Sequence, residues 1–202
     1  MTSISVITPS IGRPSLKSML NRLKPQLEEG DEVFVIGDGP RPSDKATVEE
    51  IAHPAIRYSE IPLTRNYGNP QRNLAIEQAK GDYLFFVDDD DLPSPHALSV
   101  IRKAAKEVPG RPFMFKMMHK TMELWREPLV KIGQVSGQMF VAPNVKERLG
   151  RWSGRYEADF DFITGTLALY PDKTSAIVWR NENICIQGYQ GRQEGAVEIF
   201  KD

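Results

Sequence analysis

Short apolar runs alternate with segments of helical periodicity through the first half of the chain. The apolar runs at residues 3–7, 32–36, 56–61 and 83–87 read as strands. Between them, Leu16, Met19, Leu20 and Leu23 recur at helical spacing after Pro14, and further helices are expected from Ser43 to about residue 52 and over about 70–80. Strands that alternate with helices in this way predict a parallel sheet, with right-handed crossovers and helices on its faces.

The second half of the chain has a less regular pattern. Residues 113–118, 138–142, 176–179 and 184–187 are expected to form strands, and about 159–169 a helix. Another helix is expected to start at Ser94 and Pro95. We therefore predict an α/β fold with a mostly parallel, Rossmann-like sheet flanked by helices and a mixed C-terminal half. Residues 1–202 are expected to form a single domain, since no repeat or linker is evident.

Composition and charge narrow the class of protein. Of the 202 residues, 40% are hydrophobic and 26% charged, as in ordinary globular proteins. At this size about 70% of the unfolded surface should be buried, so any bound metal is expected to serve function rather than folding. A net charge of −1 does not indicate binding to nucleic acid or to an acidic membrane. A lone cysteine, Cys185, and the lack of a signal peptide or membrane span predict a cytoplasmic protein without membrane insertion.

Four consecutive aspartates, residues 88–91, follow the entirely apolar run 83–87. Open α/β sheets bind ligands outside the carboxyl ends of their strands, which is where this run falls. Two carboxylates about 5 Å apart repel by roughly 0.8 kcal/mol in water and about 3 kcal/mol at an effective dielectric near 20, so a partly buried cluster favours a cation. Oxygen ligands suit Mg²⁺ or Mn²⁺. A solvated acidic turn is the ordinary alternative, but the buried strand before the run favours a metal site.

The sequence around this run resembles the core of family 2 glycosyltransferases. Residues 67–76 and 79–91 carry the resemblance, and the strand ends at 6–10 and 35–39 are also similar to that family. The resemblance extends over about residues 3–100. It implies a GT-A fold with an Asp-x-Asp metal motif. It also implies a metal-dependent transfer of sugar from a nucleotide-sugar donor, which we expect to be a UDP-sugar.

The resemblance also implies roles for individual residues. Asp88 and Asp90 match the two acids of Asp-x-Asp and are the expected metal ligands, with Asp90 the stronger candidate and Asp91 just beyond. Asp38 is expected to accept a hydrogen bond from the nucleobase. The other expected donor-binding residues are Pro9, Ser10 and Arg13 around the base, and Asp88 and Asp89 in the acidic run.

Arg72 lies in the first turn of its expected helix, where a cation opposes the helix dipole. This placement suggests that an external anion compensates the charge, and we assign Arg72 to the base or phosphates of the donor. A solvent-exposed arginine paired with Asp82 or Glu77 is the alternative.

An inverting transfer needs a carboxylate that accepts the proton of the acceptor hydroxyl. Asp159 resembles the aspartate of the family's Glu-Asp motif, with Ala158 in place of the glutamate, and is the expected catalytic base. The alternative is that Asp159 only caps the following helix. Glu157 and Asp161 are the substitutes.

Other features leave several choices open. The glycine-rich segment 187–195, with Arg192, is either a lid over the donor or a plain loop. Trp152 either stacks on an acceptor sugar or belongs to the core. The acceptor is open among protein, glycan, small molecule and modified nucleic acid, and homo-oligomerisation is open too. A nucleotidyltransferase on a related fold and a non-catalytic sugar-nucleotide or glycan-binding module are the competing functions.

Overall fold

The computed structural model describes residues 1–119 and 122–188. The first half of the chain forms four neighbouring parallel strands in the order β3-β2-β1-β4. Their bounds are β1 Ile4–Ser10, β2 Glu32–Asp38, β3 Ile56–Ile61 and β4 Tyr83–Phe86. The helices that connect them are α1 Ser15–Leu23, α2 Pro42–Ile51 and α3 Asn69–Gln78, with a 3₁₀ turn η1 at Lys24–Gln26. The alternation expected from the sequence is therefore confirmed in this half.

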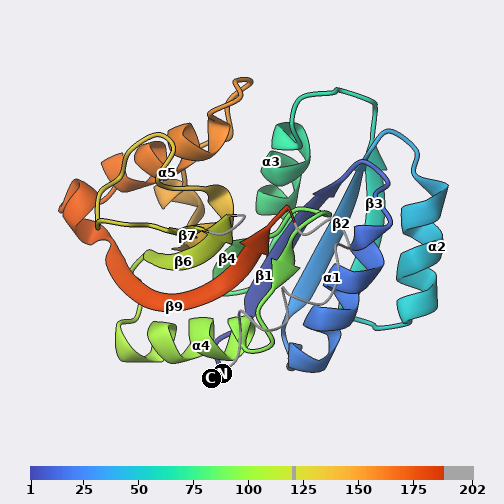
Figure 1. Cartoon of the computed structure of the whole chain (residues 1–202), viewed down its shortest axis with the longest axis horizontal. Helices are drawn as coiled ribbons and strands as arrows, with labels where there is room; N and C mark the ends of the chain where they lie inside the picture. Colours follow the sequence, from blue (N-terminus) through green and yellow to red (C-terminus); the bar gives the residue numbers. More distant parts are fainter. Residues whose placement is uncertain (120–121, 189–202) are drawn as a thin grey trace.

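Burial follows the sequence pattern closely. Every residue of β1, β2 and β4 is buried, because helices cover both faces of the parallel strands. Figure 1 shows α3 on one side of these strands and α1 on the other. On α1, Leu16, Met19, Leu20 and Leu23 are all buried, as their helical spacing predicts. The carboxyl ends of β1, β2 and β4 therefore lie at one edge of a rigid sheet.

The second half extends the sheet with strands of both directions. β4 pairs parallel with β1 and antiparallel with β8, so the all-parallel part of the sheet ends at β4. β6 pairs antiparallel with β8 and parallel with β9, and the path ends at β5, with β7 beside β6. The bounds are β5 Leu92–Pro93, β6 Phe113–His119, β7 Met122–Leu124, β8 Phe140–Pro143 and β9 Val178–Gln187. The mixed C-terminal half is confirmed.

Two longer helices and three short turns complete this half. They are α4 Ala97–Glu107, α5 Ala158–Ala168, η2 Gly137–Met139, η3 Lys146–Arg148 and η4 Lys173–Ala176. In place of the two strands expected at 176–179 and 184–187 there is one long strand of the sheet, β9 Val178–Gln187, which curves strongly along its length in Figure 1. Among the described residues, no helix combines the length and apolar composition that crossing a bilayer requires.

Some element ends differ from the sequence expectation. Ser43 lies inside α2, whose cap position is Arg41, and α4 starts at Ala97 rather than at Ser94. Gly68, not Asn69, is the N-cap of α3. Gly68 has φ +78°, a left-handed conformation that glycine adopts at no steric cost, so the chain turns there and Asn69 already belongs to the helix.

Candidate active site

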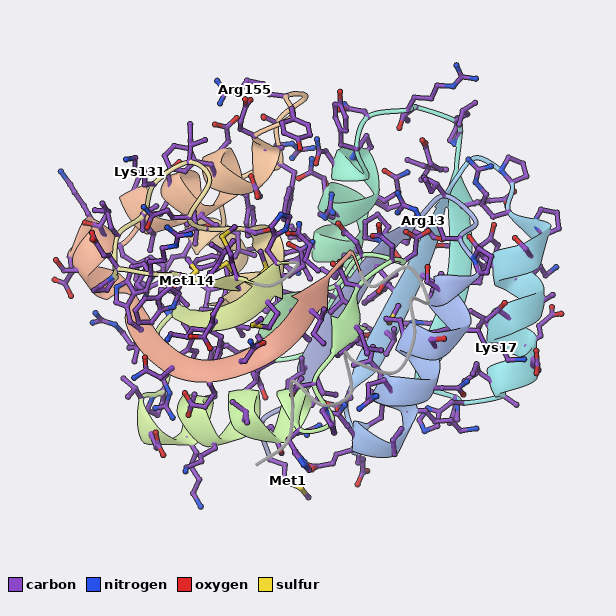
Figure 2. The ribbon with its side chains drawn as sticks, viewed as in Figure 1. Met1, Arg13, Lys17, Met114, Lys131 and Arg155 are labelled. Carbon is purple, nitrogen blue, oxygen red and sulfur yellow. The ribbon has the colours of Figure 1, made fainter. Side chains whose placement is uncertain are left out.

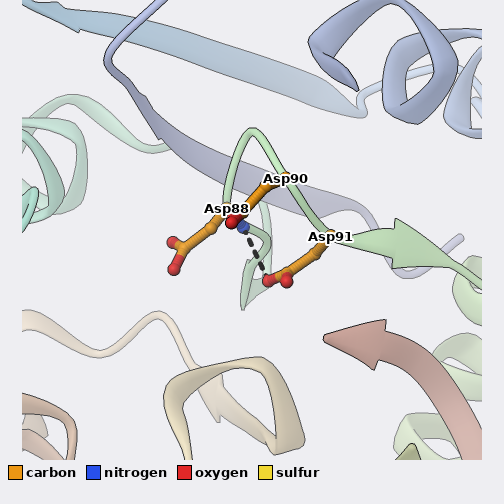
Figure 3. A group of neighbouring side chains, drawn as sticks. All are labelled: Asp88, Asp90 and Asp91. Atoms are coloured by element: carbon orange, nitrogen blue, oxygen red, sulfur yellow. Dashed lines mark hydrogen bonds between the residues drawn. The ribbon is translucent and has the colours of Figure 1, made fainter. Parts of the chain in front are cut away.

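The aspartate run forms a tight turn between β4 and β5. The Asp88 amide donates to Asp91 Oδ2 at 3.2 Å, and the Asp91 amide donates to the Asp88 carbonyl at 3.1 Å. These reciprocal bonds fold the run back on itself at the carboxyl end of β4. Figure 3 shows the side chains of Asp88, Asp90 and Asp91 projecting from this one turn.

Three carboxylates of the turn converge. Asp88, Asp90 and Asp91 each offer an oxygen, and these atoms lie within 4.8 Å of one another. The structure therefore brings together the two expected ligands and adds Asp91, which the sequence placed just beyond the motif. Because the donors are all oxygens at the end of a buried strand, the residues fit a hard divalent cation such as Mg²⁺ or Mn²⁺.

The electrostatics of the turn are unfavourable for three free carboxylates. Burial and the charges of Asp88 and Asp89 raise the pKa of Asp90, although Arg13 partly offsets them. Burial and repulsion from Asp88 raise the pKa of Asp91 well above its usual range. A cation held between these groups would relieve both the burial cost and the repulsion.

The side chain of Asp89 faces the end of β1 and the loop after it, not the other three carboxylates. It is 1% exposed and accepts bonds from Ser10 Oγ at 2.8 Å, from the Ile11 amide at 2.9 Å and from Arg13 Nη1 at 2.6 Å. Asp89 thus fixes the end of β1 at Ser10 and the following loop, which carries Arg13 to the site. The same Nη1 of Arg13 lies 3.3 Å from Asp90 Oδ1, so Arg13 contacts both carboxylates.

Arg72 is buried, with a side chain only 7% exposed, and pairs with Asp88. Neither Asp82 nor Glu77 is its partner in the described structure. Nη1 of Arg72 donates to the Tyr67 carbonyl at 2.7 Å, and the guanidinium lies 4.5 Å from the centre of the Trp152 ring. Arg72 therefore joins the acidic turn to the segment before α3.

Asp38, at the end of β2, is held by the segment after β3. Its Oδ1 accepts from the Thr64 amide at 2.7 Å and from Thr64 Oγ1 at 2.8 Å, and its Oδ2 from the Arg65 amide at 2.8 Å. Burial alone would raise the pKa of Asp38, but these hydrogen bonds outweigh it and lower the pKa. The buried side chain of Gln71 also contributes to the lowered pKa of Asp38.

Asp159 is the second residue of α5 and not its cap, which is Glu157. Its Oδ1 accepts from the Phe160 amide at 2.7 Å. Burial raises the pKa of Asp159, and the Phe160 amide and the charge of Arg72 offset it only in part. Of the two substitutes, Glu157 lines the same cavity as Asp159, whereas Asp161 is held by Ser153 Oγ at 2.6 Å and is not part of the cavity wall.

These groups share a cavity of about 1300 Å³. Its wall includes all the site residues expected from the sequence: Pro9, Ser10, Arg13, Asp38, Arg72, Asp88, Asp89, Asp90 and Asp159. Both halves of the chain contribute to the wall. A cavity of this size accommodates a nucleotide-sized ligand together with a second molecule.

Two further residues at the acidic turn were not found by sequence reasoning. Gln138 Nε2 donates to Asp88 Oδ2 at 3.1 Å and to Asp91 Oδ2 at 2.9 Å, and the Gly188 amide donates to Asp91 Oδ1 at 2.8 Å. Neither residue belongs to a motif near the acidic run in sequence. Only the pairing of β8 and β9 into the sheet brings them there.

Trp152 and Cys185 both belong to the interior of the protein. Trp152 is 5% exposed and stacks on Phe162 with ring centres 5.0 Å apart, so it belongs to the core, although its edge reaches the cavity wall. Cys185 is free and fully buried. Arg192 and the rest of the glycine-rich tail beyond residue 188 lie outside the described residues.

The parallel half-sheet, the mixed extension and the acidic turn between them are the architecture of a GT-A glycosyltransferase fold. The sequence matches the model of glycosyl transferase family 2 over residues 5–181, and the chain belongs to that family. The match reaches well past residue 100, where the motifs recognisable in the sequence end.

Among curated proteins, the GalNAc(5)-diNAcBac-PP-undecaprenol beta-1,3-glucosyltransferase of Campylobacter jejuni is 29% identical over 111 residues. The matched region covers 53% of this chain and 36% of that protein. An uncharacterized glycosyltransferase of Haemophilus influenzae is 27% identical over 118 residues, covering 55% of this chain and 37% of the relative. The chain therefore matches little more than a third of the length of either relative.

Solved structures share the fold at lower identity. TarS of S. aureus superposes with a TM-score of 0.74 and 17% identity, over 91% of this chain and 36% of that one. The mannosyltransferase PcManGT of Pyrobaculum calidifontis, in complex with GDP-Man and Mn²⁺, gives a TM-score of 0.68 at 17% identity, over 92% of this chain and 56% of that one. These likenesses confirm the predicted fold class.

Proposed function

We propose that the protein transfers a sugar from a nucleotide-sugar donor to an acceptor hydroxyl, with the help of a divalent cation and with inversion at the sugar carbon. The observation that carries this proposal is the shared cavity, in which the oxygen cluster of Asp88, Asp90 and Asp91 and the separate carboxylate of Asp159 line one space. Family membership supports sugar transfer as the chemistry.

The donor is bound at the carboxyl ends of β1, β2 and β4. Asp38 accepts a hydrogen bond from the imide N–H of a uracil, while Pro9 and Ser10 form the adjacent wall. Arg13 and Arg72 supply positive charge beside the phosphates. The solved complexes of TarS with UDP and with UDP-GlcNAc support a uridine donor, and Asp38 is the group in this chain that would select it.

The cation is held by Asp88 and Asp90, with Asp91 as a third oxygen ligand. When bound, Mg²⁺ or Mn²⁺ would neutralise the charge that develops on the departing diphosphate. The Mn²⁺ complex of PcManGT supports this use of a metal in the fold. Asp89 acts on the same region indirectly, because it orients Arg13.

The acceptor enters from the side of the cavity formed by the second half of the chain, about residues 101–202, whereas about residues 1–100 hold the donor. Asp159 takes the proton from the acceptor hydroxyl as that oxygen attacks the sugar carbon. Its raised pKa makes it a stronger base than an ordinary aspartate, which suits proton abstraction near neutral pH.

The substitution Asp159→Asn tests the base, and Asp161→Asn is the matched control on the same helix. A screen of nucleotide sugars with Mn²⁺ or Mg²⁺ first identifies the donor by thermal stabilisation, since ligand at about 100 times its dissociation constant adds roughly 2.7 kcal/mol. UDP release with that donor is then measured. Asp159→Asn is expected to keep donor affinity and to lose about 10² to 10⁴ in rate.

Asp161→Asn is expected to stay within about threefold of the wild type, which is less than 1 kcal/mol of barrier. If Asp159→Asn also stays within that range, Asp159 is not the base and its carboxylate serves only the first turn of α5. If a nucleotide sugar stabilises the protein but is not turned over, the chain is a non-catalytic sugar-nucleotide-binding module. If none stabilises it, the nucleotide-sugar donor is wrong, and a glycan-binding module or a different enzyme is left.

A further inference from the structure

Two tyrosines stand exposed at the wall of the cavity, one from each half of the chain. Tyr67 is 62% exposed and Tyr156 77%, and both belong to the residues that line the cavity. We propose that Tyr67 and Tyr156 form a platform that binds a pyranose ring of a saccharide acceptor. This inference rests on the proposed function and deepens it, because it selects a glycan among the acceptor classes left open by the sequence.

The two rings contact each other rather than the core. Their centres lie 5.5 Å apart at an interplanar angle of 80°, an edge-to-face arrangement. An aromatic pair of this kind normally buries a large area. Here most of both rings faces solvent, so the pair has apolar surface left for a further partner.

The backbone that carries the tyrosines is fixed from inside the protein. Tyr67 has φ +51°, a left-handed conformation that is unfavourable for a residue with a side chain and that the surroundings must enforce. Buried Arg72 donates to its carbonyl, and Gly68 packs directly against Pro9. A strained, enforced backbone at an exposed aromatic residue is typical of a binding position rather than of a loose loop.

The segment that carries Tyr156 is hydrogen-bonded to the start of α3, next to Tyr67. Asn69, only 2% exposed, donates from Nδ2 to the Arg155 carbonyl at 3.3 Å. The segment before α5 is therefore anchored to the start of α3. The backbone segments that carry the two exposed rings are therefore held next to each other.

The platform lies near both the proposed base and the proposed donor site. Tyr156 precedes Asp159 by three residues, at the entry to α5. Tyr67 is connected through Arg72 to Asp88 of the acidic turn. A ring bound on the platform would lie in the same cavity as the proposed base and the proposed donor site.

The chemistry of the surroundings favours a saccharide over a lipid chain. A pyranose has an apolar C–H face that can lie on an aromatic ring and an edge of hydroxyls that need polar partners. Glu157 lines the cavity beside Tyr156, and the half-exposed Arg155, labelled in Figure 2, pairs with Asp161 at 3.1 Å and lies 3.8 Å from Glu157. These charged neighbours interrupt the apolar surface, whereas a lipid chain requires a continuous apolar patch.

The first experiment uses saturation-transfer NMR with methyl pyranosides and disaccharides at millimolar concentration, in the presence of UDP and Mn²⁺. The wild type is expected to transfer saturation to the C–H protons of one ring face. Tyr156→Ala and Tyr67→Ala are expected to bind the same saccharide about tenfold more weakly, and Tyr156→Phe about as well as the wild type. Because both side chains are exposed, these variants are expected to keep the thermal unfolding temperature of the wild type.

Leu169→Ala is the matched control, since Leu169 is 48% exposed at the other end of α5 and is not part of the cavity wall. It is expected to leave saccharide affinity unchanged. The dissociation constant for UDP is expected to change by less than about twofold in the tyrosine variants, because their effect is confined to the acceptor.

Saccharide binding that is equal in Tyr156→Ala and the wild type would overturn the platform, as would the absence of saturation transfer to every saccharide. Tyrosine-dependent binding to phosphatidylglycerol vesicles without saccharide binding would assign the surface to a lipid instead. A failure of the donor screen with saccharide binding intact would reject the proposed function and leave the platform standing.

Discussion

Replacing Gly68 by alanine perturbs the point at which β1, α3 and Arg72 meet. A Cβ atom at Gly68 would lie 2.6 Å from Pro9 Cβ, 2.8 Å from Pro9 Cγ and 3.0 Å from Arg72 Nη1. Pro9 belongs to the buried strand β1 and cannot retreat without moving the sheet. Gly68 also has φ +78°, where any residue with a Cβ is strained.

The magnitude follows from two contributions. The left-handed backbone costs alanine roughly 1–2 kcal/mol. Forcing a methyl group into a filled space typically costs a further 1–3 kcal/mol. Gly110→Ala is the matched control, because Gly110 has φ +72° and nothing within 4 Å of the added Cβ. Only the backbone contribution applies there, so the difference between the two variants isolates the clash with Pro9.

The assay is urea unfolding followed by tryptophan fluorescence, with thermal unfolding alongside. Gly68→Ala is expected to lose about 1–3 kcal/mol more free energy of unfolding than Gly110→Ala, or about 2–12 °C in melting temperature at this chain length. UDP affinity should fall in Gly68→Ala, because Arg72 is displaced, and stay unchanged in Gly110→Ala. Losses equal within about 0.5 kcal/mol, the usual limit of additivity, would refute the close packing of Gly68 against Pro9.

The remaining predictions concern the proposed ligands and the base. Asp90→Ala is expected to abolish transfer and to weaken Mn²⁺-dependent donor binding, as measured by calorimetry; full turnover of the wild type in excess chelator would contradict the metal assignment. Asp38→Ala should weaken binding of UDP more than binding of inorganic diphosphate, and equal losses would place Asp38 away from the base. Asp159 must be ionised to act, and burial, only partly offset by the Phe160 amide and Arg72, raises its pKa. Activity should therefore be lost as the pH falls through that raised pKa, so the acidic limb of kcat/KM should lie above about 3.9, the pKa of an ordinary aspartate. A pH–rate profile that stays flat down to that value would show that Asp159 is not the base.

The parallel half of the fold was predictable because its signals are local. Strands buried on both faces require apolar residues at every position, and residues 83–87 meet that requirement without reference to the rest of the chain. Helical spacing after Pro14 likewise identified the buried face of α1. The second half was less predictable, because β9 is a single curled strand whose pairing with β5 and β6 depends on distant partners.

The acidic turn shows the same division at the level of single residues. Its four aspartates are alike in sequence, and their place after a buried strand was enough to predict a cation site. The backbone of the turn decides that Asp89 faces the loop after β1 while Asp88, Asp90 and Asp91 converge. A run of identical residues does not tell in which direction each side chain points. That direction depends on the backbone dihedral angles, which the hydrogen bonds of the turn fix.

Contacts across the two halves were decided by the tertiary structure alone. Arg72 could be assigned to an anion from its place in a helix, but its pairing with Asp88 needs α3, which packs on β1 and β2, to start beside the turn that follows β4. Gln138 lies 47 residues from Asp91 in sequence, and the exposed Tyr67 and Tyr156 belong to segments that meet only at the cavity wall. Local sequence sets which elements form and which faces they bury, because those depend on short-range periodicity. Which polar side chains share a cavity depends on how the elements pack, and that is a property of the whole chain.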